Sequence, residues 1–153
     1  MAQQMRLAAV YEAGDAWLAD SSAHPTLVRA AWNKDSLAPI ASGGRWLAAE
    51  TALLDTMKAL NRICEEHRGP VLADTEAHKA WWLVSLDAAD ELADVRQVTV
   101  HVPGRPLHCP PTGWHLDSRM WLCRPDGSGR LTEPAVLAAA FGPGGHRHPA
   151  EAR

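Results

Sequence analysis

The sequence has little of several features that would classify a protein quickly. Its 153 residues include three cysteines, at positions 64, 109 and 123. Their odd number and irregular spacing exclude a disulfide framework, so we expect a reducing, cytoplasmic environment. No stretch approaches the roughly eighteen apolar residues of a transmembrane helix, so we expect no membrane partner. The N-terminal segment carries Glu12, Asp15 and Asp20 and has no apolar core, which argues against a secretory signal.

Basic charge is also scarce. The chain has 15 lysines and arginines against 18 aspartates and glutamates, which gives a net charge of −3 with the eight histidines neutral. Proteins that bind nucleic acid by themselves usually carry a basic balance or a basic face. The net charge therefore favours a protein partner. The alternative partner is nucleic acid, bound through a local basic patch.

The composition is otherwise that of a globular protein. Hydrophobic residues make up 46% of the chain and charged residues 22%, and there are seven tryptophans against one phenylalanine and one tyrosine. We expect one domain over residues 1–142. The glycine-rich segment 143–153 is expected to be a flexible tail.

Apolar periodicity predicts helices on both sides of a central region. The spacing predicts helices over residues 3–19 and from Pro25 onward, with a short extended piece at 38–41. A continuous apolar stripe predicts a long helix over 51–67. The triplet Thr132-Glu133-Pro134 predicts the start of a C-terminal helix, with the Thr132 hydroxyl as its N-cap.

The central region alternates extended and helical segments. Short strands are predicted at 45–49, 71–73, 81–84 and 97–102, with a further strand at 120–123. Between the third and the fourth of these lies an alanine- and acid-rich stretch, 87–94, that predicts a short helix. The order strand, helix, strand, strand, helix, strand is that of a split βαβ, or RRM/ferredoxin-like, sheet. The predicted fold is therefore α+β, with helices before and after this core.

The first core strand lacks a pair of carboxylates. Enzymes that hold two divalent cations often place acids one residue apart on such a strand, so that both point the same way. Here the strand reads Leu47, Ala48 and Ala49, and Glu50 is its one acid.

Two groups of residues have ligand chemistry. Asp74, Glu76 and His78 could hold a divalent metal, with Glu50 in support; the alternative is a solvated polar turn. His101, His108, Cys109, His115 and Cys123 could ligate zinc, although their spacing matches no usual zinc motif. The alternative places the cysteines in the core. Trp81 and Trp114 are candidates for a binding surface on which nucleic-acid bases stack; the alternative is a structural role for the tryptophans.

Several short motifs occur in an order that resembles a known family. They are Trp17-Leu18-Ala19, His24-Pro25, Gly69-Pro70-Val71-Leu72, Cys109-Pro110-Pro111, Trp121-Leu122 and Pro125-Asp126-Gly127-Ser128-Gly129. In this order they resemble small actinobacterial proteins related to the N-terminal domain of bifunctional primase–polymerases. The resemblance implies an RRM-like core. It also implies metal-dependent nucleotide transfer, with acids on the first core strand and a histidine on a later one.

The residues on the first strand decide how much of the resemblance carries over. Leu47, Ala48 and Ala49 stand where the family would hold metal, and no neutral residue replaces a carboxylate in that role. We therefore expect the fold without the activity: a non-catalytic accessory or regulatory binding module, needing no cofactor. The alternative is a divergent nucleotidyltransferase or nuclease that uses Asp74, Glu76, His78 and Glu50 with Mg²⁺ or Mn²⁺.

Overall fold

A five-stranded antiparallel sheet forms the centre of the molecule. The computed structural model describes residues 2–142 of the chain. The sheet consists of β2 (Leu47–Ala52), β3 (Val71–Asp74), β4 (Lys79–Val84), β5 (Thr99–Val100) and β7 (Arg119–Cys123). Its strand order is β5-β2-β4-β3-β7, and every neighbouring pair is antiparallel.

This order contains the predicted split βαβ arrangement. β2 and β3 both run antiparallel to β4, so they are parallel to each other with β4 between them. Helix α3 (Leu53–Leu60) lies in the connection between them. In the same way β4 and β5 flank β2, and α4 (Ala88–Glu91) lies in their connection. The α+β class and the strand order are confirmed, and β7 extends the sheet next to β3.

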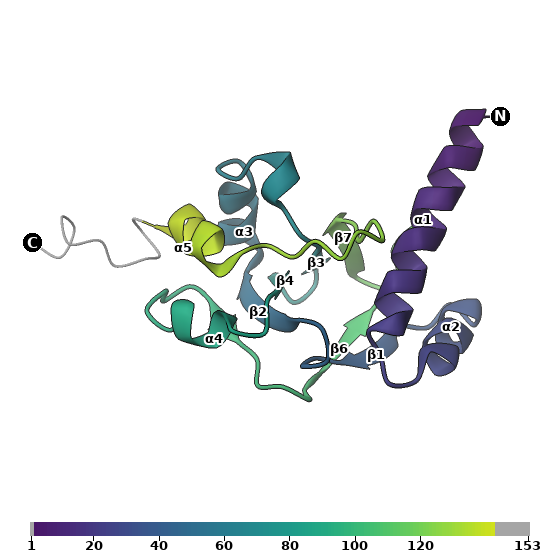
Figure 1. Ribbon diagram of the computed structural model, residues 1–153, viewed down its shortest axis with the longest axis horizontal. Helices are drawn as coiled ribbons and strands as arrows, with labels where there is room; N and C mark the ends of the chain where they lie inside the picture. The colour runs from purple at the N-terminus through teal and green to yellow at the C-terminus, as the bar shows by residue number, and fades with distance from the viewer. Residues whose placement is uncertain (1, 143–153) are drawn as a thin grey trace, which may run out of the picture.

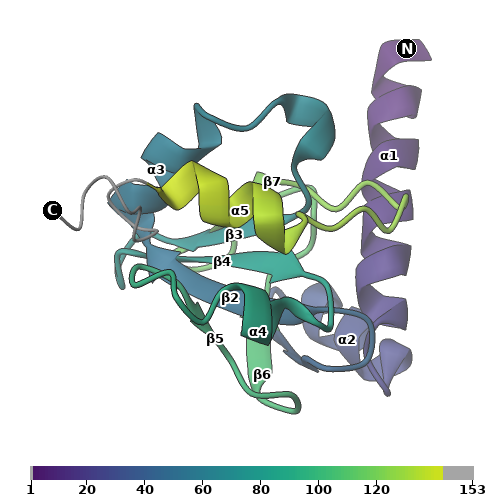
Figure 2. The ribbon, with the colours of Figure 1, turned by 60° about the vertical axis from the view of Figure 1, so that its left-hand side comes forward.

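Helices cover one face of the sheet. α3 and α4 pack there together with α5 (Pro134–Phe141), as Figure 2 shows. The core on this face takes alternate residues of the strands, among them Leu47, Ala49, Trp82 and Val84. Trp82 donates a hydrogen bond of 2.8 Å from its indole N–H to the Thr56 hydroxyl of α3. A large apolar ring is thereby buried with its polar group satisfied.

The two N-terminal helices and a two-stranded ribbon cover part of the other face. They are α1 (Ala2–Asp20), α2 (Pro25–Asn33) and a two-stranded ribbon of β1 (Ala38–Ala41) and β6 (Pro106–Cys109). Their core includes Trp46, Ala48, Trp81 and Trp121 from the sheet side. The N-terminal half of α1 extends past the rest of the chain, and residues 2–10 are exposed (Figure 1).

Three predicted elements have different bounds. The helix expected over 51–67 is shorter, because Thr51 and Ala52 pair with Ala80 and Lys79 as the end of β2. After Leu60 the Arg68 side chain donates hydrogen bonds of 2.8 and 2.9 Å to the carbonyls of Leu60 and Ile63. A separate 3₁₀ turn, η1 (Glu65–His67), follows. The strand expected at 45–49 lies at 47–52, and the one at 97–102 is reduced to β5.

The start of α5 was predicted at the right place with the wrong cap. The N-cap residue is Glu133, whose side chain makes no capping hydrogen bond. The Thr132 hydroxyl instead accepts a 2.8 Å hydrogen bond from the backbone N–H of Gly69. The contact between Gly69 and Thr132 therefore uses the hydroxyl that the sequence motif predicted as the helix cap.

Within residues 2–142 no helix is long and apolar enough to cross a membrane. The predicted flexible tail, 143–153, lies outside the described residues. Cys64, Cys109 and Cys123 are free thiols.

Candidate functional site

Polar side chains gather where the two N-terminal helices and the two-stranded ribbon leave the sheet uncovered. Because strand side chains alternate, Glu50 shares a face with Ala48, and Lys79 shares it with Trp81. Asp74 lies opposite both Lys79 and Arg119 in the strand register. The ends of four strands thus bring a carboxylate or a cation to one end of one face.

A pocket of about 410 Å³ opens at this end of the sheet. We call it the sheet-face pocket. Its lining residues are Glu50, Ala77, Lys79, Trp81, His101, Arg105, Pro106, Leu107, His108 and Arg119. They come from β2, β4 and β7, from β6, and from the segments before β4 and β6.

Glu50 is the acceptor at the centre of the pocket. Its Oε1 lies 2.9 Å from His101 Nε2 and accepts a 3.2 Å hydrogen bond from the Trp81 indole N–H. Its Oε2 lies 3.3 Å from Lys79 Nζ. His101 is held in place by its backbone N–H, which donates to the Ala48 carbonyl at 2.8 Å. Both oxygens of the carboxylate are therefore engaged by donors.

Arg119 forms the wall of the pocket beside β3. Its guanidinium lies 4.5 Å from the centre of the Trp81 ring, a cation–π distance. Its Nε donates to Asp74 Oδ2 at 3.1 Å, and its Nη1 donates to the His108 carbonyl at 2.7 Å. Three different elements thus fix the plane of this side chain.

Asp74 accepts more hydrogen bonds than Arg119 alone supplies. Its Oδ1 accepts from the Ser118 hydroxyl at 2.7 Å and from the backbone N–H groups of Glu76 and Ala77, each at 3.0 Å. The last two bonds close the turn between β3 and β4, a local pattern that aspartate favours. Asp74 as a whole residue is 7% exposed, and both oxygens of its carboxylate have donors.

Both carboxylates are stabilised in the charged form. Burial opposes ionisation of Glu50, but the hydrogen bonds from His101 and Lys79 outweigh it and lower its pKa. Burial also opposes ionisation of Asp74, yet the bonds from Ala77, Ser118 and Arg119 lower its pKa. The two acids are thus bound to cations and N–H or O–H donors of the protein itself.

The structure places the predicted metal residues in two groups. Glu50 lines the sheet-face pocket, and Asp74 lies behind its Arg119 wall. Glu76 and His78 are exposed in the turn, where His78 has a backbone φ of 56°. Among residues 2–142 no group of three histidine, cysteine or acidic side chains is arranged to hold a metal ion.

The zinc candidates are dispersed as well. His101 and His108 line the sheet-face pocket, and His115 is exposed in a loop. Cys109 is fully buried among apolar side chains, which raises the pKa of its thiol to about 12. Burial likewise raises the pKa of Cys123. The cysteines behave as core residues, the alternative stated above.

The two tryptophans of the predicted binding surface differ in exposure. Trp114 is 52% exposed, whereas Trp81 is 5% exposed and has the Arg119 guanidinium over its ring. Trp81 and Trp82 face opposite sides of the sheet, as strand alternation requires. Trp81 therefore contributes to the pocket as a support for Arg119.

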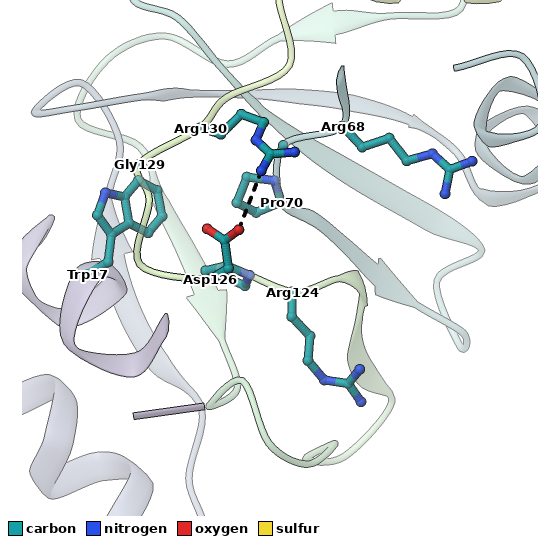
Figure 3. Close-up of a pocket in the computed structure, with 9 residues that line it drawn as sticks. Trp17, Arg68, Pro70, Arg124, Asp126, Gly129 and Arg130 are labelled. Carbon is teal, nitrogen blue, oxygen red and sulfur yellow. Dashed lines mark ion pairs between the residues drawn. The ribbon is translucent and has the colours of Figure 1, made fainter. Parts of the chain in front are cut away.

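A second pocket is much smaller than the sheet-face pocket. It lies between α1 and the segment after β7 and has a volume of about 20 Å³, which suits about one water molecule. In Figure 3 Arg130 points toward Asp126, at 3.6 Å, while Arg68 and Arg124 point away. Arg124 donates to the Thr112 carbonyl at 2.8 Å and stacks on Tyr11.

Three cations of the sheet-face pocket were missed from the sequence: Lys79, Arg105 and Arg119. The signal was the period of two on each strand, since Lys79 precedes Trp81 and Arg119 precedes Trp121 by two residues.

No family model matches the chain, and neither curated proteins nor solved structures gave a significant match.

Proposed function

We propose that this chain is a non-catalytic accessory or regulatory binding module with a primase–polymerase-like sheet. It acts in the cytoplasm with a protein partner, which the net charge of −3 favours. Its ligand site is the sheet-face pocket.

One observation carries the proposal. On the pocket face of β2 the three positions hold Ala48, Glu50 and Ala52, so Glu50 is the one acid of this face. Two cations held for nucleotide transfer need several carboxylate oxygens. Here the one acid at this place has both oxygens bonded to protein donors.

The alternative is a divergent metal-dependent nucleotidyltransferase or nuclease. It is favoured by the position of Asp74 and Glu50 at the same end of the same sheet face. For that role the metal would have to displace Arg119 from Asp74 and His101 and Lys79 from Glu50. Such displacement costs the charge-assisted hydrogen bonds that lower the pKa of both acids.

A calorimetric titration with Mn²⁺ separates the two functions. We expect the full chain to show no saturable Mn²⁺ binding, and we expect Glu50→Gln and Asp74→Ala to give the same trace as the wild type. Saturable binding that both substitutions abolish, in variants with an unchanged circular dichroism spectrum, would overturn the proposal in favour of the enzyme.

A further inference from the structure

We propose that the sheet-face pocket binds the phosphate group of a small phosphorylated molecule, without a metal ion. This inference rests on the non-catalytic role proposed above and names the ligand class of the same site.

The first argument is the charge that lines the pocket. Lys79, Arg105 and Arg119 bring three cations, against the one carboxylate of Glu50. Glu50 is compensated, because each of its oxygens has a donor within 3.3 Å. Asp74, which does not line the pocket, forms an ion pair with Arg119 and compensates its charge. With both acids counted, the site keeps an excess of one positive charge in a protein whose net charge is −3.

Arg105 supplies a cation that is free to bind a ligand. Its backbone N–H and carbonyl bond to Val102 and Ser42, which fixes the loop before β6. Within residues 2–142 its guanidinium makes no ion pair and no hydrogen bond. The planar guanidinium of an arginine at a pocket wall, with all five donors available, can donate to two oxygens of a phosphate at once.

Arg119 supplies a second guanidinium whose orientation is already set. Asp74 and the His108 carbonyl take two of its five N–H donors, and the Trp81 ring supports its plane. Three N–H donors remain for a ligand. Binding therefore does not have to order this side chain, and the entropy cost of association is lower.

The size of the site and the charge of the whole molecule favour a small ligand over a nucleic-acid strand. A volume of about 410 Å³ is in the range of small-molecule pockets. A long polyanion would also be repelled by the rest of a protein whose net charge is −3.

Titration of the full chain with inorganic phosphate and pyrophosphate, in the presence of EDTA, tests the proposal. We expect saturable binding of pyrophosphate that weakens about tenfold in Arg105→Ala, since a hydrogen bond to a charged group is lost. Arg105 is exposed, so this substitution should leave the fold unchanged. Arg6→Ala, which removes an exposed arginine from the projecting half of α1, is the matched control and should bind as the wild type does.

Three results would overturn the proposal. One is the absence of saturable binding with either anion. Another is an equal loss in Arg6→Ala and Arg105→Ala, which would indicate general charge attraction. The third is tighter binding of a single-stranded oligonucleotide than of pyrophosphate, which would assign the pocket to nucleic acid. A saturable Mn²⁺ site would instead overturn the non-catalytic role, so the two failures are distinguishable.

Discussion

At the scale of single residues, Asp74 is a positioning residue for Arg119. In Asp74→Asn the amide oxygen can keep the bonds that Oδ1 accepts from Ser118, Glu76 and Ala77. The amide nitrogen then replaces Oδ2 and faces the Arg119 Nε–H, donor against donor. We expect hydrogen exchange at Arg119 Nε to accelerate and pyrophosphate binding to weaken roughly tenfold.

Nuclear magnetic resonance of the arginine side chains measures this effect, and two other arginines serve as internal references. Arg68 Nε and Arg124 Nε donate to the carbonyls of Ile63 and Thr112, away from Asp74. Their exchange rates should not change. A variant in which all three arginines exchange faster has lost structure generally. An Arg119 signal that stays as slow as in the wild type would contradict the positioning role.

At the scale of elements, Gly14 sets how closely α1 approaches the segment after β7. A Cβ at this position would overlap the Pro125 carbonyl oxygen and lie 3.0 Å from the Thr112 methyl carbon. Alanine in place of glycine normally stabilises a helix interior by about 1 kcal/mol. Here we expect Gly14→Ala to destabilise the protein by about 1–3 kcal/mol, because the helix must move away from its neighbour.

Urea denaturation compares this variant with a second glycine-to-alanine change. At Gly44 the nearest atom to an added Cβ is the Ser21 carbonyl oxygen at 3.4 Å, an ordinary contact. Gly44→Ala should therefore change the free energy of unfolding by about 0.5 kcal/mol or less. If Gly14→Ala proves more stable than the wild type, helix propensity dominates and α1 does not pack as described.

The sequence predicted most elements, and its errors have a common physical origin. The order of strands and helices from β2 to β5 followed from local periodicity, which the fold obeys. The helix predicted over 51–67 begins later than expected because pairing of Thr51 with Ala80 outweighs an apolar stripe. Within the helix predicted over 3–19, periodicity did not show that Gly14 is a point of close approach to another segment. Each error concerns a contact between segments far apart in the chain.

The candidate site was predicted in part for the same reason. Glu50 and Asp74 were identified as chemically important, because an isolated acid at the end of an apolar strand is visible in the sequence. Their partners were not. The bonds from Arg119 to Asp74 and from His101 to Glu50 span 45 and 51 residues. The pairing of β3 with β7 brings Arg119 to Asp74, and the pairing of β5 with β2, continued by the His101 N–H bond to Ala48, brings His101 to Glu50.

At the scale of the whole molecule, the net charge of the chain differs in sign from the charge of the pocket. A net charge of −3 favours a protein partner over nucleic acid, yet the sheet-face pocket brings together three cations. The same clustering connects the site to the stability of the fold, because its two acids have lowered pKa values. Their charge-assisted bonds form only when the chain is folded.

This connection predicts a loss of stability in acid. A carboxyl whose pKa is lower in the folded than in the unfolded state stabilises the fold above its unfolded pKa, and this contribution disappears as the pH falls through its folded pKa. For Asp74 and Glu50 the ordinary values are 3.8 and 4.5, so the loss should begin below about pH 4.5. Urea denaturation of the wild type between about pH 7 and pH 3 measures it.

Glu50→Gln should be less stable at pH 7 and lose less on acidification, because one of the two titrations is gone. Glu76→Gln removes an exposed turn carboxyl of the same type and should keep the wild-type slope. Equal slopes in all three proteins would mean that Glu50 is not bound by His101 and Lys79 in solution.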